Sequence, residues 1–204
     1  MKLGAIREDI PSHKNLMSVA AARKTETLFR QYKIGKVQDQ GDLGACVAYS
    51  LTNLFRAEPI SQNPFDPVEL YYAIRKDKGY HGEDGLRLSD AVDYVIKQGK
   101  VKEDLWTNSA EQVGLYIFNY SPVVLSIPWK TGMDEPKKDG RAKPGGNLRG
   151  FHAVMAYSFD RLKNRIWLQN QFGLSYGKNG CFYLTLEDLD KLMREGGSGC
   201  ALLE

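Results

Sequence analysis

The chain has 204 residues, of which 42% are hydrophobic and 26% are charged. This length favours one domain with a sizeable core, and this composition excludes a mainly disordered or fibrous protein. The 28 basic residues outnumber the 25 acidic ones by only three, so the charge indicates neither nucleic acid nor an anionic membrane as the main partner. No run of 18 apolar residues occurs, and acidic residues interrupt the N-terminus. We therefore expect neither a membrane span nor a secretory signal.

The first half of the chain is predicted to be mainly helical. A polar loop with two glycines leads to Cys46, and apolar residues then recur at helical spacing, so a helix is predicted to begin at about Cys46. Asp66 and Pro67 suit the N-cap and the first position of a second helix. Residues 88–96 predict a third helix, with Gly99 just beyond its end.

The second half changes to a strand-like pattern. Apolar, β-branched and aromatic residues are concentrated in four runs, at residues 123–127, 151–157, 165–170 and 181–186. Helices followed by strands predict a single α+β domain. Its mainly helical half, residues 37–121, would pack against a mainly antiparallel β half, residues 122–204, with the site in the cleft between them.

The remaining segments are predicted to be less regular. Residues 1–36 form a lead-in of mixed charge, in which the apolar stretch 16–29 suits a helix. Residues 128–150 carry scattered basic residues among glycines and prolines, which is typical of a solvated loop; a mobile lid or a patch for an acidic partner is the alternative. Residues 196–199, Gly-Gly-Ser-Gly, are expected to be a flexible tail segment.

Cysteine usage indicates a reducing compartment. Cys46, Cys181 and Cys200 are odd in number and widely spaced, unlike a disulfide framework, so we expect a cytoplasmic protein, with a viral or phage origin left open. Cys181 is expected to be a packed strand thiol and Cys200 an exposed tail thiol. Neither lies near a second ligand at zinc spacing, and the acidic residues beside His81 suit a solvated loop, so no metal or other cofactor is expected.

Four residues in chain order suit acyl-transfer chemistry. Cys46 is placed at a helix N-terminus, where the partial positive charge favours the thiolate nucleophile. His152 lies early in a strand and is the candidate base, although a lone strand histidine is more often structural. Asn170 suits the group that orients the imidazole, and Phe172 suits a shield for their hydrogen bond. Gln40 would stabilise an oxyanion together with the backbone N–H of Cys46.

These residues lie in three blocks that resemble the papain-like cysteine proteases. Residues 40–50, QGDLGACVAYS, resemble the active-site segment of that family. Residues 151–154 resemble its histidine strand, and residues 170–180 its asparagine block. The resemblance implies a two-lobed papain-like fold and a catalytic set of Cys46, His152, Asn170 and Gln40, with a protein or peptide as substrate.

The resemblance also implies a substrate-binding loop. Residues 82–86, GEDGL, resemble the family's glycine-rich loop, so Gly85 is expected to meet the substrate backbone. Gly44 and Phe151 are expected to line the same site.

Several departures from the family pattern bear on regulation and stability. Leu43 stands where many secreted members have a disulfide cysteine, and Val47 and Phe172 stand where tryptophans are usual. The Gln-Gly-Asp-Leu-Gly form of residues 40–44, together with residues 4–11, GAIREDIP, is more similar to bacterial, archaeal or viral members. The lead-in is too short for the family's usual inhibitory pro-segment, which leaves a separate inhibitor protein open.

The sequence therefore predicts a cysteine peptidase that works through an acyl-enzyme. Two alternatives stay open. One is a catalytically weak or inactive peptide-binding module, and the other is an isopeptidase or transpeptidase that uses the same chemistry.

Overall fold

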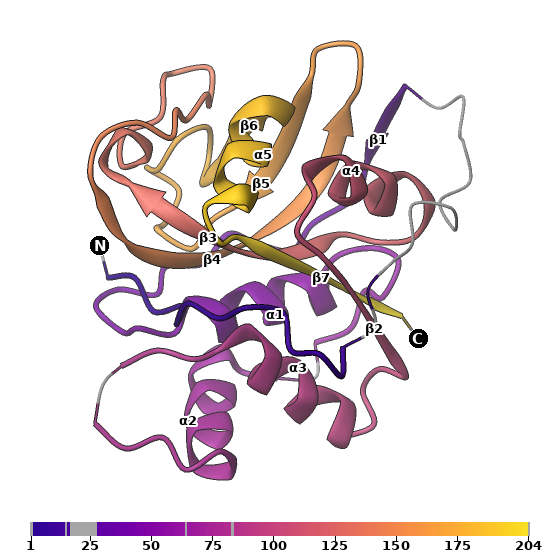
Figure 1. Ribbon diagram of the computed structural model, residues 1–204, viewed down its shortest axis with the longest axis vertical. Helices are drawn as coiled ribbons and strands as arrows, with labels where there is room; N and C mark the ends of the chain where they lie inside the picture. The colour runs from indigo at the N-terminus through magenta and orange to yellow at the C-terminus, as the bar shows by residue number, and fades with distance from the viewer. Residues whose placement is uncertain (1, 15, 17–27, 64, 83, 204) are drawn as a thin grey trace.

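The computed structural model describes residues 2–14, 16, 28–63, 65–82 and 84–203. A seven-stranded antiparallel sheet dominates one half of the molecule, and three helices form the other (Figure 1). The mixed α+β architecture expected from the order of helices and strands is confirmed. The helix expected over residues 16–29 falls mostly outside the described residues, and at its end Phe29–Gln31 forms strand β1.

The helical half contains α1 (Cys46–Arg56), α2 (Pro67–Asp77) and α3 (Leu88–Lys97). The predicted start of α2 is confirmed, because the Asp66 side chain accepts hydrogen bonds from the backbone N–H groups of Val68 and Glu69. Helix α1 is buried along nearly its whole length. It contacts the sheet on one side and α2 and α3 on the other, so it ties the two halves together.

The sheet carries the second half of the predicted site on its longest strands. Its strand order is β2–β7–β3–β4–β5–β6, and β1 pairs with β4. The strands are β2 (Glu103–Thr107), β3 (Val123–Lys130), β4 (Leu148–Asp160), β5 (Arg165–Gln169), β6 (Cys181–Thr185) and β7 (Ser198–Leu203). The four predicted strand runs are β3 to β6, and β3 and β4 extend further than expected because part of the predicted loop pairs as sheet.

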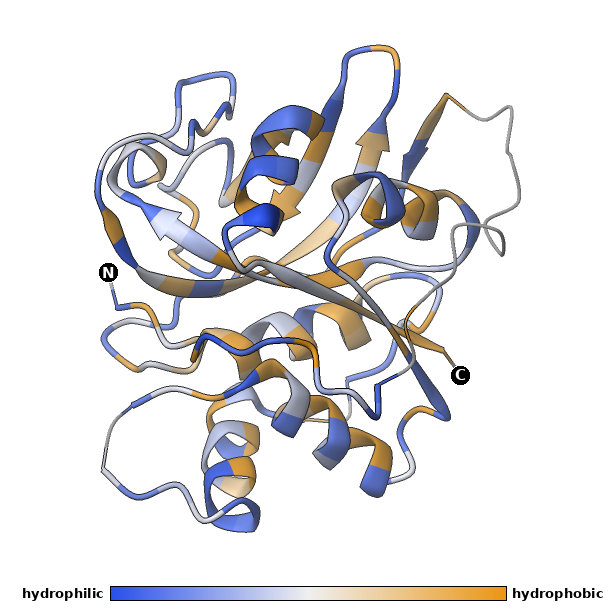
Figure 2. Cartoon of the chain, in the orientation of Figure 1, coloured by the Kyte–Doolittle hydropathy of each residue, from blue (hydrophilic) through white to orange (hydrophobic). Residues whose placement is uncertain are grey.

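Two further helices cover the sheet half. These are α4 (Ala110–Asn119) and α5 (Leu186–Arg194), with a short 3₁₀ turn, η2 (Thr131–Met133), after β3. Both α4 and α5 pack into the core of the sheet half, so the helical half ends before α4 rather than at residue 121. Figure 2 shows the polar outward face of α5, whose apolar residues point to the sheet.

The expected flexible tail is wrong. Ser198 and Gly199 begin β7, which lies between β2 and β3 within the sheet. Cys200, expected to be an exposed tail thiol, is 1% exposed. A Cβ on Gly199 would lie 2.8 Å from Leu125 Cδ2, so glycine is needed here for close packing rather than for flexibility.

All three cysteines are free and buried, and Cys181 is packed on β6 as expected. Among the described residues, no helix has the length and apolar character needed to cross a bilayer. In the same part of the chain, no group of three or more potential metal ligands comes together.

Candidate active site

Cys46 is the first residue of α1 and lies against the strand that carries His152. The glycine loop leads into this helix, and the N-cap residue, Ala45, provides no side-chain hydrogen bond to it. The thiol Sγ accepts a hydrogen bond from the backbone N–H of Ala153 at 3.4 Å. The helix N-terminus therefore brings the thiol to the residue that follows His152 on β4.

The imidazole of His152 is oriented by Asn170. His152 Nε2 lies 2.9 Å from Asn170 Oδ1, and the same oxygen accepts the backbone N–H of Gln171 at 2.9 Å. Because the Asn170 oxygen is thereby fixed as an acceptor, Nε2 must carry the proton in the neutral ring. His152 Nδ1 is then the unprotonated nitrogen, and it has no hydrogen-bond partner among the described residues.

Two aromatic rings enclose the imidazole. Phe172 stacks on it with ring centroids 4.6 Å apart and an angle of 20° between the planes, in the position expected for a shield. Trp129 meets it edge-on at 4.7 Å and 74°. The sequence did not single out Trp129, whose role depends on the pairing of β3 with β4, where Ile127 faces His152 and Trp129 faces Gly150.

Gln171 is a second residue that the sequence reasoning missed. Its Nε2 donates to the carbonyl of Ala153 at 2.8 Å and lies 3.2 Å from His152 Nε2. The main-chain carbonyl of Gln171 accepts a hydrogen bond from the backbone N–H of Gln40 at 3.0 Å. Gln171 thus links the histidine strand to the loop that carries the predicted oxyanion donor.

Gln40 is buried, and its amide group faces two carbonyls. Its Nε2 donates to the carbonyl oxygen of Leu43 at 2.7 Å and to that of Lys2 at 2.9 Å. The first bond holds the side chain over the glycine loop that precedes Cys46. The second bond engages this side-chain amide, which is the donor predicted for the oxyanion, with the main-chain carbonyl of Lys2.

The three predicted substrate-binding residues meet the same N-terminal stretch. The Phe151 carbonyl accepts the N–H of Ala5 at 3.3 Å. A Cβ built on Gly4 would lie 2.0 Å from the Gly44 carbonyl oxygen, and one on Gly85 would lie 2.7 Å from the Gly4 oxygen. The main-chain groups of Gly85 itself bond to the side chains of Tyr71 and Arg75.

Leu86, rather than Gly85, provides the main-chain pairing on the helical side. Its N–H donates to the Gly4 carbonyl and its carbonyl accepts the Ile6 N–H, both at 2.9 Å. Ala5 therefore forms a parallel β-bridge with Leu86 and an antiparallel β-bridge with Phe151. The N-terminal stretch thus contacts both halves of the molecule.

Burial keeps the thiol and the imidazole uncharged. Cys46 and His152 are both 0% exposed. Burial raises the pKa of Cys46 to about 11, although N–H groups that include those of Ala153 and Gly4 act in the opposite direction. Burial also lowers the pKa of His152 to about 4, against the effect of its bond to Asn170. The expectation that the helix N-terminus favours the thiolate is therefore wrong for this buried thiol, because desolvation outweighs the partial positive charge of the helix end.

No family model and no curated protein sequence matches the chain. Solved structures do. Xylellain, a cysteine protease from Xylella fastidiosa, superposes with a TM-score of 0.78 at 17% identity, over 98% of this chain and 95% of that one. The chain has a papain-like fold.

Two digestive enzymes extend the likeness to the papain-like fold. Procathepsin L 3 from the larval midgut of Tenebrio molitor has a TM-score of 0.71 at 12% identity, over 94% of this chain and 75% of that one. Procathepsin L2 from the same tissue has 0.69 at 13%, over 94% and 74%. In this fold the N-terminus of α1 lies against β4, the strand that carries His152. The case for a particular chemistry depends on the side chains that meet there.

Proposed function

We propose that this protein is a cysteine peptidase that hydrolyses peptide bonds through a thioester intermediate. The observation that carries the proposal is the contact set in which Cys46 Sγ bonds to the N–H of Ala153 while the adjacent His152 is oriented by Asn170 at 2.9 Å. A nucleophile, a base and an orienting group are the three parts that such chemistry needs.

In the proposed first step, the Cys46 proton moves to His152 Nδ1 and the sulfur attacks the peptide carbonyl carbon. Gln40 Nε2 and the backbone N–H of Cys46 stabilise the negative charge on the carbonyl oxygen. The imidazolium then gives its proton to the departing amine as the C–N bond breaks. Asn170 accepts from Nε2–H throughout, so Nδ1 stays available for proton transfer.

In the second step, His152 Nδ1 takes a proton from water, and the hydroxide oxygen attacks the thioester. The C–S bond then breaks, the sulfur recovers the proton and the carboxylic acid product leaves. No external oxidant, metal or cofactor is required by this sequence of steps. The substrate is accordingly a protein or peptide, and nucleic acid and membrane have no part in the proposal.

The test measures cleavage of a peptide library by the full chain and by its Gly4→Val variant, in which the new side chain would overlap the Gly44 carbonyl. Cys46→Ala is the matched control in both backgrounds. We expect hydrolysis that disappears with Cys46→Ala. Failure of both chains to cleave any peptide, or cleavage that persists in Cys46→Ala, would overturn the proposal.

The acceptor is tested in the same assay by adding a primary amine. Hydrolysis in the presence of the amine supports a peptidase. Aminolysis products alone would replace it by a transpeptidase with the same acyl-enzyme chemistry.

A further inference from the structure

Gln171 lies where strand β5 would continue along β4. Met155 of β4 pairs with Gln169, the last residue of β5, so an uninterrupted antiparallel ladder would pair Ala153 with the main chain of Gln171. Instead, side chains bond to the main-chain groups of Ala153. The Gln171 amide donates to its carbonyl at 2.8 Å, and Cys46 Sγ accepts its N–H at 3.4 Å. Gln171 and the candidate nucleophile are therefore joined to the same residue.

The Ala153 carbonyl determines which end of the Gln171 amide faces the site. A carbonyl oxygen only accepts hydrogen bonds, so the group bonded to it is the NH₂ group. The same nitrogen lies 3.2 Å from His152 Nε2, and Gln171 is completely buried. Its Oε1 is buried as well and has no hydrogen-bond partner among the described residues, which costs stability. The amide is thus held with its positive end towards the imidazole.

His152 Nε2 lies between an acceptor and a donor. Asn170 Oδ1 accepts its proton at 2.9 Å, which leaves no lone pair on Nε2 for the Gln171 N–H to bind. The contact between Gln171 and His152 is accordingly a contact between two donors. When the ring gains a second proton on Nδ1, its positive charge spreads over both nitrogens and meets the positive end of the amide. The contact therefore disfavours the imidazolium.

The remaining neighbours of the imidazole are mainly apolar. Phe172 and Trp129 cover the ring, and Ile127 of β3 pairs with His152 across the sheet. Cys46 of α1 is the titratable side chain beside the histidine strand. An amide dipole acts strongly in such surroundings, because little water is present to screen it.

Charged and titratable side chains around this apolar layer are bonded to groups other than His152. They are Tyr176, whose hydroxyl donates to the Met133 carbonyl at 2.8 Å, Asp134, which accepts the indole N–H of Trp129 at 2.8 Å and pairs with Arg149, and Arg7, which lies over the ring of Phe151 at 5.9 Å. Burial lowers the pKa of His152, and the bond to Asn170 raises it. Asn170 and Gln171 are thus the polar side chains that contact the imidazole.

We propose that Gln171 is a positioning residue whose side-chain amide keeps Cys46 and His152 as a neutral thiol–imidazole pair. The inference rests on the proposed function of the same site. A neutral pair transfers its proton while the sulfur attacks the carbonyl carbon, as in the proposed first step. A charged pair would hold a thiolate in advance. Gln171 therefore couples the proton transfer to the attack.

The test follows the protonation of His152 by NMR titration of the ring nitrogens in the full chain. Comparison with His152→Gln separates its signals from those of His13 and His81. Gln171→Met keeps the length of the side chain and removes the donor, and Gln171→Glu places a carboxylate there, which favours the imidazolium. We expect the protonation constant of His152 to rise about threefold or more in Gln171→Met and about tenfold or more in Gln171→Glu.

Gln169→Met is the matched control. Gln169 is also completely buried, its Nε2 donates to the Gly35 carbonyl at 3.1 Å, and its Oε1 has no partner among the described residues. Both methionine variants therefore lose a buried hydrogen bond from a side chain to a main-chain carbonyl. Gln169→Met should lower the free energy of unfolding by a similar amount and leave the protonation constant of His152 at the wild-type value.

The thiol provides a second readout. In Gln171→Glu the imidazolium should stabilise the thiolate of Cys46. The ultraviolet absorbance of this thiolate, measured as the difference from the same chain with Cys46→Ala, is expected to appear at lower pH than in the wild type. Gln169→Met should leave this titration unchanged.

Three results would overturn the proposal. The first is wild-type protonation of His152 in both Gln171 variants. The second is an equal rise in Gln171→Met and Gln169→Met, because loosened packing would then be the cause. The third is a protonation constant in Gln171→Glu that is no higher than in Gln171→Met, because the charge at this position would then have no effect on the ring.

The two proposals fail in different ways. If the Gln171 variants change the protonation of His152 as expected but no chain cleaves peptides, the role of Gln171 in the neutral pair stands and the peptidase fails. If cleavage depends on Cys46 while His152 titrates alike in all variants, the peptidase stands and the role of Gln171 fails.

Discussion

His152 Nε2 lies 2.9 Å from Asn170 Oδ1, and that oxygen is itself fixed by the backbone N–H of Gln171. This relationship determines the tautomer of the histidine. It leaves the unprotonated Nδ1 as the ring nitrogen that would accept the cysteine proton in the proposed mechanism.

Removing this orienting group should reduce peptide hydrolysis. Asn170→Ala leaves the Nε2–H of a fully buried ring without its acceptor, which costs about 1–3 kcal/mol and lowers kcat/KM by roughly 5- to 150-fold. The measurement is peptide hydrolysis in the Gly4→Val background. Asn147→Ala, at an exposed position, is the control, and equal kcat/KM values for the two variants would contradict the role.

The stacked ring of Phe172 should control the protonation of His152. Phe172→Ala opens one face of the imidazole, so water can solvate the charged form and the pKa of His152 should rise from about 4 towards its ordinary range. NMR titration of the imidazole measures this shift. Phe29→Ala, at a half-exposed position on β1, should leave the titration unchanged, and an unaltered pKa in Phe172→Ala would argue against shielding by this ring.

Acid should destabilise the folded chain through His152. Between pH 6.5 and about 4 the unfolded histidine binds a proton that the native one does not, so the free energy of unfolding falls as pH falls through this window. The linked loss is on the order of 3 kcal/mol. Urea unfolding at several pH values should show a shallower acid limb in His152→Gln, while His81→Gln, on an exposed loop, keeps the wild-type slope.

Alkali should destabilise the chain through Cys46. Above pH 9.0 the unfolded thiol loses a proton that the native thiol retains up to about pH 11, so the free energy of unfolding falls as pH rises through this window. Urea unfolding of Cys46→Ala should lack this loss. An identical alkaline limb in the variant would show that other groups cause it.

Close packing of β7 predicts a stability effect far from the site. Gly199→Ala would place a methyl group 2.8 Å from Leu125 Cδ2 and should cost about 1–3 kcal/mol of unfolding free energy. Gly145→Ala is the control, because no atom lies within 4 Å of a Cβ there. Chemical denaturation compares the two variants, and equal midpoints would show that β7 can shift to accept the side chain.

The sequence alone was sufficient for the local features of the site. Helix periodicity and a capping residue predicted where α1 and α2 begin, and runs of β-branched and aromatic residues predicted β3 to β6. The blocks around Cys46, His152 and Asn170 led to the proposed chemistry, because each block is a contiguous stretch whose residue types can be read directly. Strand β7 was not predicted because its glycine, Gly199, is needed for close packing, which a local pattern cannot distinguish from flexibility.

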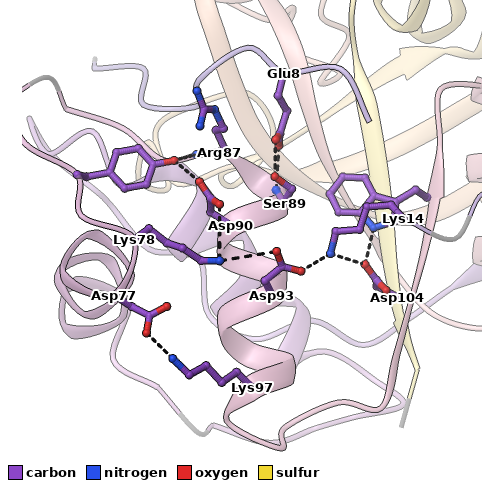
Figure 3. Close-up of polar contacts among 12 residues, drawn as sticks. Glu8, Lys14, Asp77, Lys78, Arg87, Ser89, Asp90, Asp93, Lys97 and Asp104 are labelled. Carbon is purple, nitrogen blue, oxygen red and sulfur yellow. Dashed lines mark hydrogen bonds and ion pairs between the residues drawn. The ribbon is translucent and has the colours of Figure 1, made fainter. Parts of the chain in front are cut away.

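Only the tertiary structure decided the state of that site. The pKa values of Cys46 and His152 depend on burial in the folded arrangement, where Ala153 lies beside Cys46 and Phe172 stacks on His152. The positions of Trp129 and Gln171 depend on strand register. In the sequence, Lys14 is one of several charged residues of the lead-in. Only the fold brings Asp93 of α3 and Asp104 of β2 into contact with it (Figure 3). Desolvation and long-range ion pairing are properties of the folded arrangement, so composition and residue spacing cannot predict them.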